Sequence, residues 1–209
     1  MPRNGTATRD RILDNAERLA LDKGFAATSI DEVIAASNSS KGAFFHHFPS
    51  KNDLGRALLN RYAEADVAAL AAFMERAEAM TDDPGRQVSV FVGLFEEIGE
   101  EILDEQQSSC LYASFVHDRQ LTLDGGTAGI NEAIVAWRTA IAAKLALAAP
   151  AHPALAALDL DALADHVFVT FEGAFILARA TGDLGAMRAQ LRILRQFLDA
   201  LLGQPERTG

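Results

Sequence analysis

The sequence contains very little cysteine, since Cys110 is the only one among 209 residues. A single cysteine excludes an intramolecular disulfide framework and fits a reducing cytoplasm. No apolar run reaches about 18 residues, the length expected of a membrane span, and the N-terminal segment has no apolar stretch that would indicate export. No segment of useful length alternates apolar and polar residues, so strands are not expected. These absences predict a soluble, all-α protein.

Patterns typical of catalysis and metal binding are lacking as well. No Gly-rich phosphate loop and no Gly-x-Ser-x-Gly segment occurs. The pairs His117-Asp118, Asp165-His166 and His46-His47 are sequence neighbours, and neighbours on a helix do not face each other. No Cys or carboxylate completes a ligand set around the last pair. We therefore expect no catalytic residue, no metal and no cofactor, which leaves a small α-helical enzyme as the least supported class.

Charge is distributed unevenly along the chain. The net charge is −10, but residues 1–60 carry eight Lys/Arg and seven Asp/Glu, a net of +1. Residues 61–209 carry eleven and twenty-two, a net of −11. An acidic total argues against a nucleic-acid partner, yet the acidic load lies outside the first 60 residues. That segment can still bind DNA through helix N-termini and a few lysines, with a shallow salt dependence.

The segment from Thr28 to Leu54 places two helix starts and a tight turn in 27 residues. Thr28-Ser29-Ile30-Asp31 predicts a capping box with Thr28 as the N-cap and a helix beginning near Ser29. Ser37-Asn38-Ser39 ends that helix, because Asn tolerates the left-handed conformation. A short second helix begins after the cap Ser40 and ends at Phe48-Pro49. This is the layout of a helix-turn-helix reader of DNA.

Further helices are expected on both sides of this segment. Residues 9–23 have apolar residues at helical spacing and end at Gly24, a typical C′ residue. A long helix over about 50–80 contains no breaker and is shared by both halves of the chain. Asp82-Asp83-Pro84-Gly85 is the clearest boundary, and Glu96-Glu97 belongs to the acidic, solvated face of the helix that follows it. The later helices are expected over about 110–119, 127–148, 159–181 and 184–202, with a linker from Pro150 to about Leu158.

The sequence thus predicts about nine helices in two domains. A three-helix helix-turn-helix domain occupies residues 1–50. A larger helical domain occupies residues 51–209.

A known family shows the same order of motifs. Gly24-Phe25, Thr28 and the run from Ser40-Lys41-Gly42 to Leu54 follow the order Gly-Phe, Thr, helix, Ser-Lys-Gly-x-x-Tyr-x-x-Phe-x-x-Lys-x-x-Leu. Over about residues 8–56 this resembles the DNA-binding half of the tetracycline-repressor (TetR) family of bacterial regulators. Three positions depart from the family pattern. Phe45 replaces the common Tyr, Asn38 the common turn Gly, and Ser39 a common apolar residue.

The resemblance implies DNA contacts from the second helix of the motif and its flanks. Lys41 would reach a guanine edge or a phosphate, and Ala43 would meet a thymine methyl. Residues that look like phosphate clamps are Thr28, Ser40, His47 and Lys51. The alternative is that the hydroxyls only cap helices and the lysines are only solvated. The remaining predicted DNA-binding residues are Ser39, Gly42, Phe45 and His46.

If their helix faces converge, the aromatic residues of the second half would line an apolar cavity suited to a flat or apolar ligand. The alternative is that they form ordinary core. The predicted ligand-binding residues are Phe91, Phe95, Cys110, Tyr112, Phe115, Trp137, Phe168 and Phe171.

The resembled family also binds small-molecule inducers in its back half and dimerises through its last two long helices. The residues that would form such an interface here, or else an intrachain core, are Phe171, Phe175, Leu177, Leu191, Leu194, Phe197, Leu198 and Leu201. Ser109-Cys110-Leu111 is similar to a subset with a Ser/Gly-Cys-Leu helix start, in which some members sense electrophiles. A thiol near a helix N-terminus has a lowered pKa, but a lone cysteine is also common as inert packing.

Together these features predict a cytoplasmic, homodimeric transcriptional regulator. It would be a repressor that binds a palindromic operator and is released by a ligand. The two helix-turn-helix domains of the dimer would lie about 34–36 Å apart, or further. It would have no membrane partner. The alternative is a helical ligand-binding or interaction protein with a vestigial DNA reader.

Overall fold

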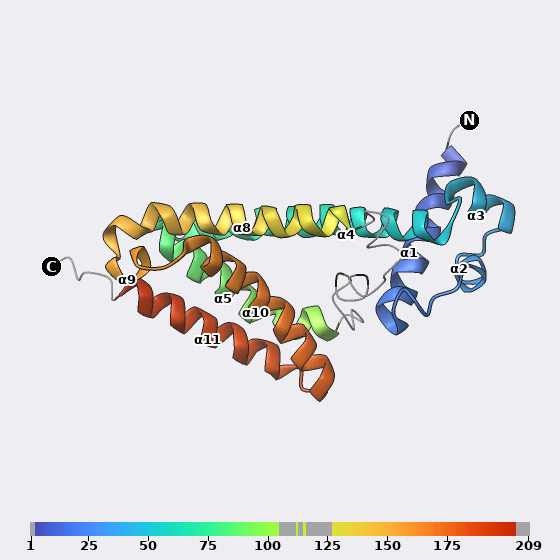
Figure 1. Cartoon of the computed structure of the whole chain (residues 1–209). Coiled ribbons are helices and arrows are strands. Elements are labelled where there is room, and N and C mark those ends of the chain that lie inside the picture. The colour runs from blue at the N-terminus through green and yellow to red at the C-terminus, as the bar shows by residue number, and fades with distance from the viewer. Residues whose placement is uncertain (1–2, 105–111, 113–114, 116–126, 204–209) are drawn as a thin grey trace. The chain divides into compact units, whose positions relative to one another are not determined.

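The computed structural model describes residues 3–104, 112, 115 and 127–203. These residues form nine α-helices and one 3₁₀ turn, with no strand among them, which confirms the all-α prediction. The chain divides into two compact units. The first comprises residues 1–65 and 107–132, and the second residues 66–106 and 133–209. Figure 1 labels the helices along the chain.

The first unit begins with the three helices of the expected motif. They are α1 (Arg3–Lys23), α2 (Ile30–Ala36) and α3 (Lys41–His47), followed by the start of α4 (Lys51–Met80). α1 begins six residues before the predicted start at residue 9. Gly24 has φ 87° and Asn38 has φ 47°. The residues that end α1 and α2 thus both adopt the predicted left-handed conformation. Ser40 caps α3 by accepting the Ala43 N–H at 3.1 Å.

The capping box at the start of α2 lies one residue later than predicted. Ser29 is the N-cap, its Oγ accepts the Glu32 N–H, and Glu32 Oε2 accepts the Ser29 N–H at 2.8 Å. Thr28 is instead buried and donates its hydroxyl to the Gly24 carbonyl at 3.0 Å. The pattern fitted both Thr28-x-x-Asp31 and Ser29-x-x-Glu32, and the longer Glu side chain makes the second box.

Ser29→Ala is expected to lower the free energy of unfolding of the first unit by about 1 kcal/mol, because the cap is lost. The hydrogen bond from Lys23 and that from the Ser29 backbone lower the pKa of Glu32 from 4.5 to about 2. Because the pKa is lower in the folded state than in the unfolded state, ionised Glu32 stabilises the folded first unit above pH 4.5. This contribution is lost as the pH falls towards 2. Urea unfolding at neutral pH and near pH 2 would measure both effects. Thr6→Ala, an exposed change in α1, serves as the control.

The core of the first unit is rich in phenylalanine. Phe115 is fully buried and stacks on Phe25, with ring centroids 4.4 Å apart. Tyr112 packs edge-on against Tyr62 at 4.9 Å. The N-terminal helices and early α4 supply the other large buried side chains, which are Ile12, Leu13, Phe44, Phe48, Leu54, Leu58 and Leu59.

The second unit contains the rest of α4 and most of the later helices. They are α5 (Pro84–Asp104), α8 (Ala128–Ala148, which begins in the first unit), α9 (Pro153–Ala156), α10 (Leu160–Thr181) and α11 (Gly185–Leu202). Three predicted helices, 127–148, 159–181 and 184–202, are confirmed within two residues. The predicted linker instead contains a 3₁₀ turn (Ala149–Ala151) and α9, because Pro150 and Pro153 lie at the second and first positions of these turns, where proline is tolerated. The helix predicted over 110–119 lies largely outside the described residues.

One predicted surface residue is buried in the second unit. Glu96 has a side chain only 11% exposed, between α5 and α11. Its two carboxylate oxygens lie 2.8 Å from Arg192 Nε and 3.0 Å from Arg195 Nε. The prediction of a solvated face was therefore wrong for Glu96, whereas Glu97 is exposed as expected. Two arginines nearly a hundred residues away make burial of the carboxylate possible.

The segment Ala128–Ala151 is long and apolar enough, by length and composition alone, to cross a membrane. The apolar run in this segment falls short of about 18 residues because Arg138 and Lys144 interrupt it. Both of these side chains form ion pairs within the unit, Arg138 with Asp165 and Lys144 with Glu78. Between these two residues around the helix, α8 contributes Trp137, Ile141 and Leu145 to the core. We therefore interpret α8 as a core helix.

Candidate nucleic-acid interface

The turn between α2 and α3 is tied both to its own helix and to α1. Ser37 Oγ donates to the Val33 carbonyl at 2.7 Å and lies 2.9 Å from Ser39 Oγ. Arg11 Nε of α1 donates to the Ser37 carbonyl at 2.7 Å. These bonds fix the direction in which α3 leaves the turn.

α3 has an inner and an outer face. Phe44 is fully buried, and Phe48, directly after the helix, is 2% exposed. The exposed residues are Lys41, Gly42, Phe45 and His46. At about 100° per residue these four span an arc of about 140°, with Phe44 outside it. The arc holds a cation, an imidazole and an exposed ring, which suits contact with an external partner.

Among the described residues, nothing packs closely enough on Gly42 to require a glycine there. A Cβ placed there would meet nothing closer than Ser40 Oγ, at 4.0 Å. Glycine costs a helix about 1 kcal/mol relative to alanine. A glycine on the open face, next to Lys41, fits a place where a ligand approaches the helix backbone closely.

The two lysines predicted to contact DNA are placed differently. Lys41 is exposed and makes no hydrogen bond or ion pair within the described part of the chain. Lys51 donates from Nζ to the Ala26 carbonyl at 2.9 Å and lies 4.9 Å from the centroid of the Phe25 ring. Lys41 is thus available to a partner, whereas Lys51 already joins α4 to the segment after α1.

The other predicted DNA-binding residues also have defined places. Ser40 Oγ is used as the cap of α3, and Thr28 is buried. His47 is half-buried, with its ring centroid 5.1 Å from that of His46. Ser39 and Ala43 are half-buried as well. Most of the predicted DNA-binding residues therefore lie on α3 or at its N-cap, whereas Thr28 is buried in the segment before α2.

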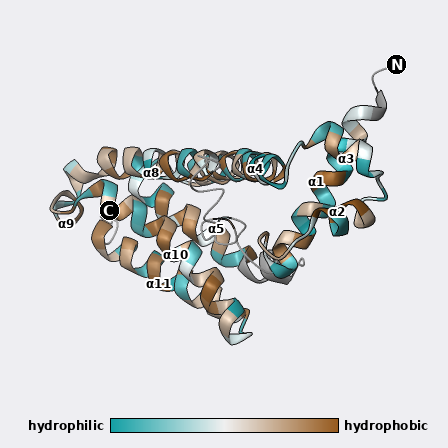
Figure 2. Cartoon of the chain, turned by 45° about the vertical axis from the view of Figure 1, so that its right-hand side comes forward, coloured by the Kyte–Doolittle hydropathy of each residue, from teal (hydrophilic) through white to brown (hydrophobic). Residues whose placement is uncertain are grey.

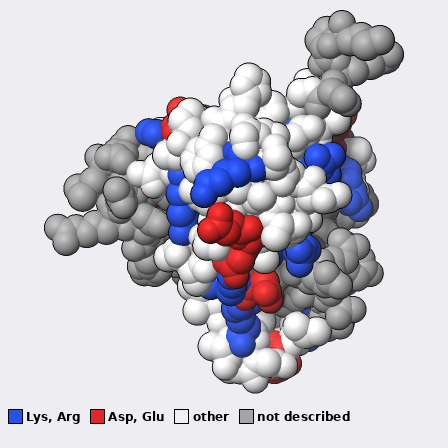
Figure 3. Space-filling view, turned by 90° about the vertical axis from the view of Figure 1, so that its right-hand side faces the viewer, with Lys and Arg blue, Asp and Glu red and all other residues white. Residues whose placement is uncertain are grey.

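Figure 3 shows the side of the molecule on which α1–α3 lie. Lys and Arg side chains are interspersed with Asp and Glu there, and the described residues in this view form no continuous basic surface. This agrees with the net charge of +1 over residues 1–60.

The predicted ligand-binding residues fall into two groups. Phe91, Phe95, Trp137, Phe168 and Phe171 cluster in the second unit, with the rings of Phe95 and Phe171 4.9 Å apart and those of Phe91 and Trp137 5.5 Å apart. Trp137 Nε1 donates to Asp66 Oδ2 at 3.1 Å. Tyr112 and Phe115 pack in the first unit, and Cys110 lies outside the described residues.

A hollow of about 370 Å³ opens on the second unit between α4 and α8. Its apolar lining is Val67, Leu70, Ala71, Met74, Ala136 and Ala140. Sequence reasoning missed these residues because small and aliphatic side chains on a helix look like ordinary core.

The residues predicted for a dimer interface divide between the core and the surface. Phe171, Leu191, Leu194 and Leu198 are buried within the unit, so these four are intrachain core. Phe197 and Leu177 are 43% and 39% exposed. The prediction missed exposed apolar residues on α10 (Val169 and Ile176), at the N-cap of α11 (Leu184) and on α11 (Ile193). Figure 2 shows brown, apolar residues along both helices.

Among the described residues, no group of three or more His, Cys, Asp or Glu side chains is placed to hold a metal ion. Asp165, considered in the sequence as a catalytic partner of His166, instead binds Arg138 through both oxygens at 2.6 and 2.7 Å. The Arg138 guanidinium lowers the pKa of this carboxyl below its usual value.

Comparison with known proteins places the helix-turn-helix segment in a family. Residues 12–58 match the family described as "Bacterial regulatory proteins, tetR family". The HTH-type transcriptional repressor NemR of Escherichia coli K12 is 32% identical over 71 residues, which are 34% of this chain and 36% of that repressor. The match thus spans about a third of that relative. The transcriptional regulator AcuR of Cereibacter sphaeroides is 26% identical over 76% of this chain and 70% of its own.

Solved structures extend the likeness in fold to nearly the whole chain. A TetR-family regulator from Agrobacterium tumefaciens has a TM-score of 0.75 at 23% identity, covering 93% of this chain and 98% of that one. The reduced form of E. coli NemR has a TM-score of 0.73 at 16% identity, covering 95% and 100%. The helix-turn-helix segment therefore matches the TetR family of bacterial regulators, and nearly the whole chain shares the fold of solved members of that family.

Proposed function

We propose that this protein is a cytoplasmic transcriptional repressor that binds a palindromic DNA operator as a homodimer and is released by a small ligand. The observation that carries the proposal is the outer face of α3, where exposed Lys41 and Gly42 follow the Ser40 cap and make no contact that requires them among the described residues. Two such helices related by a two-fold axis would enter successive major grooves about 34–36 Å apart, or further for longer operators. In this proposal residues 1–50 read DNA, and residues 51–209 bind the ligand and dimerise.

Lys41→Ala is expected to weaken operator binding by about 1–3 kcal/mol per half-site, because the variant loses a contact to a base edge or phosphate. The measurement is a gel shift with DNA from the region flanking the gene, repeated over a range of salt concentrations. If Lys41 contacts a phosphate, the loss will be uniform across sequences and the salt slope will be shallower. If it contacts a base, discrimination at one base pair will relax.

Lys23→Ala is the matched control, since Lys23 is held by Glu32 at the start of α2 and lies outside the α3 face. Equal affinity of the Lys41→Ala variant and the wild type for a protected operator would contradict the assignment of Lys41. Failure to select any specific sequence from random DNA would favour the vestigial reader over the repressor.

Homodimerisation is proposed through the exposed apolar residues of α10 and α11. On α10, Val169 and Ile176 flank Gly173 at helical spacing, and both are about 60% exposed. A Cβ on Gly173 would meet nothing within 4 Å, so its own chain does not require a glycine there. A partner helix that approaches closely at Gly173 would account for it. Exposed apolar residues grouped on two adjacent helices are typical of a subunit interface.

The ligand is proposed to be small and apolar or aromatic, bound at the aromatic cluster of the second unit. Support comes from rings contributed by α5, α8 and α10, from the polar Asp66–Trp137 hydrogen bond among them, and from the apolar hollow between α4 and α8. Such a mixture of apolar lining and a few polar groups is typical of ligand sites. A ligand that binds more tightly to the DNA-free dimer must weaken operator binding by the same factor.

The similarity to the subset with a Ser/Gly-Cys-Leu helix start makes Cys110 a second candidate for the input signal. One solved relative, NemR of E. coli, was crystallised in a reduced form. We keep Cys110 as a candidate sensor thiol on that basis, next to the apolar ligand.

A further inference from the structure

A second hollow in the second unit has a chemistry opposite to that of the aromatic cluster. It lies between α5 and α11, measures about 310 Å³, and is lined by Gly93, Glu96, Glu97, Arg188, Arg192 and Arg195. Three arginines and two glutamates give the lining a net charge of +1. The arginines follow one another at i, i+4 and i+7, so they form one stripe on α11.

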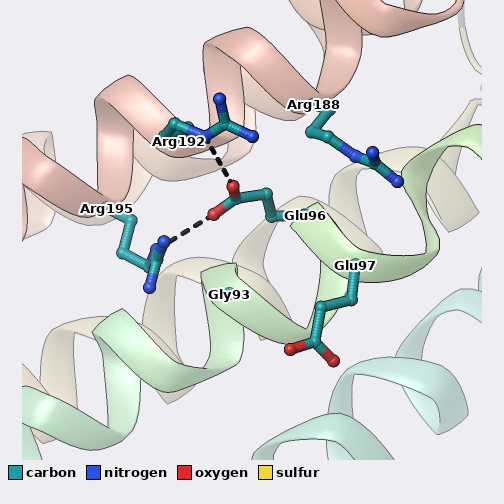
Figure 4. A pocket seen from close by; sticks show the side chains of 6 residues that line it. All are labelled: Gly93, Glu96, Glu97, Arg188, Arg192 and Arg195. Atoms are coloured by element: carbon teal, nitrogen blue, oxygen red, sulfur yellow. Dashed lines mark hydrogen bonds and ion pairs between the residues drawn. The ribbon is translucent and has the colours of Figure 1, made fainter.

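Glu96 holds two of these arginines in place. Figure 4 shows Arg192 and Arg195 converging on Glu96 while Glu97 points elsewhere. Arg192 Nε donates to one oxygen at 2.8 Å, and Arg195 Nε lies 3.0 Å from the other without the angle of a hydrogen bond. Gly93 makes room for this arrangement, because a Cβ there would lie 3.3 Å from Arg195 Cδ. A buried carboxylate thus orients two guanidinium groups.

The terminal nitrogens of the two guanidinium groups remain available. Both ion pairs are closest at Nε, and among the described residues no hydrogen bond is formed by the Nη atoms of Arg192 and Arg195. The side chains are 52% and 42% exposed, so solvent and solutes reach them. A guanidinium group binds carboxylate and phosphate oxygens through paired N–H donors.

We propose that the hollow between α5 and α11 is a binding site for a small anion with carboxylate or phosphate oxygens. The Nη groups of Arg192 and Arg195 would bind the anion, Arg188 would add positive charge, and Glu96 would fix the geometry. The site would be independent of the apolar ligand.

This site stays open in the proposed dimer. At about 100° per residue, the arginine stripe lies about 150° around α11 from Ile193 and Phe197, the exposed apolar residues of the proposed interface. An anion would therefore bind each subunit of the dimer, not the contact between subunits.

The test is calorimetric titration of the full-length protein with succinate and, separately, with inorganic phosphate at constant ionic strength. Binding of succinate alone would support a carboxylate ligand, and binding of phosphate alone a phosphate ester. Arg192→Gln should weaken either by about tenfold to a hundredfold, since charge-assisted hydrogen bonds are lost. Arg179→Gln, an exposed change at the end of α10, should leave binding unchanged.

Glu96→Gln provides a change in the opposite direction. Gln keeps an oxygen that can accept from Arg192 Nε and so hold its orientation, but it removes the negative charge that competes with the anion, so binding should tighten severalfold. Binding of neither anion would overturn the proposal. Binding that is unaffected by Arg192→Gln would also overturn it, because the anion would then be held elsewhere, as at the DNA-binding face.

Discussion

The double change Ile193→Asp and Phe197→Asp is expected to convert the protein to a monomer. The two side chains are 60% and 43% exposed on α11, so the folded subunit loses little when they change. In the proposed dimer both would be buried, and each subunit would lose about 1.5–3 kcal/mol per apolar side chain and bury an unpaired charge. Because a two-fold interface contains every residue twice, the dissociation constant should rise at least about a thousandfold.

Sedimentation velocity over a range of protein concentrations would measure this change. Leu147→Asp is the matched control, since Leu147 is 69% exposed but lies on α8. The control should remain a dimer, and the double variant should also lose operator affinity because each subunit reads only a half-site. An intact dimer of the double variant would place the interface on other residues.

Phe44→Ala is expected to destabilise the first unit by about 3–5 kcal/mol. Phe44 is fully buried, and its ring centroid lies 5.3 Å from that of Phe45 and 5.9 Å from that of Phe48. α3 is only seven residues long, too short to be stable without packing. Loss of the Phe44 ring should therefore unfold α3 and abolish operator binding, even though Lys41 is still present.

Thermal unfolding followed by circular dichroism, with a gel shift on the same samples, would check this expectation. Phe45→Ala is the control for packing, since the neighbouring ring is 40% exposed on the outer face of the same helix. That variant should keep its melting temperature within a few degrees. A Phe44→Ala protein that still melts and binds like the wild type would show that α3 is held by other contacts.

Local signals in the sequence were sufficient for most helix boundaries. Gly24 and Asn38 stop helices in the left-handed conformation, and Ser40 caps α3, because each effect depends on only a few neighbouring residues. The error at the start of α2 was also local. Thr28 and Ser29 are both good N-caps. Which of them caps α2 depends on which acidic side chain accepts the backbone N–H of the cap residue.

Contacts between distant residues were beyond the reach of spacing arguments. Glu96 was assigned to solvent because nothing near it in sequence indicates Arg192 and Arg195. The one available signal was the stripe of arginines at i, i+4 and i+7 on an amphipathic helix, which could have indicated a carboxylate partner on a neighbouring helix. Likewise, Phe115 was grouped with Trp137 as a ligand contact, yet it stacks on Phe25 in the other unit. Helical periodicity identifies an apolar face but not the partner that covers it.

Phe115 has a consequence for the order in which the protein matures on the ribosome. The chain is made from its N-terminus, so residues 1–65 emerge well before the segment 107–132 that completes the same unit. Until Phe115 arrives, Phe25 lacks the ring that stacks on it. The core behind the helices that we propose to read DNA is therefore complete only after more than half of the polypeptide has been synthesised, and a gene fragment that ends at residue 65 would encode an incomplete core.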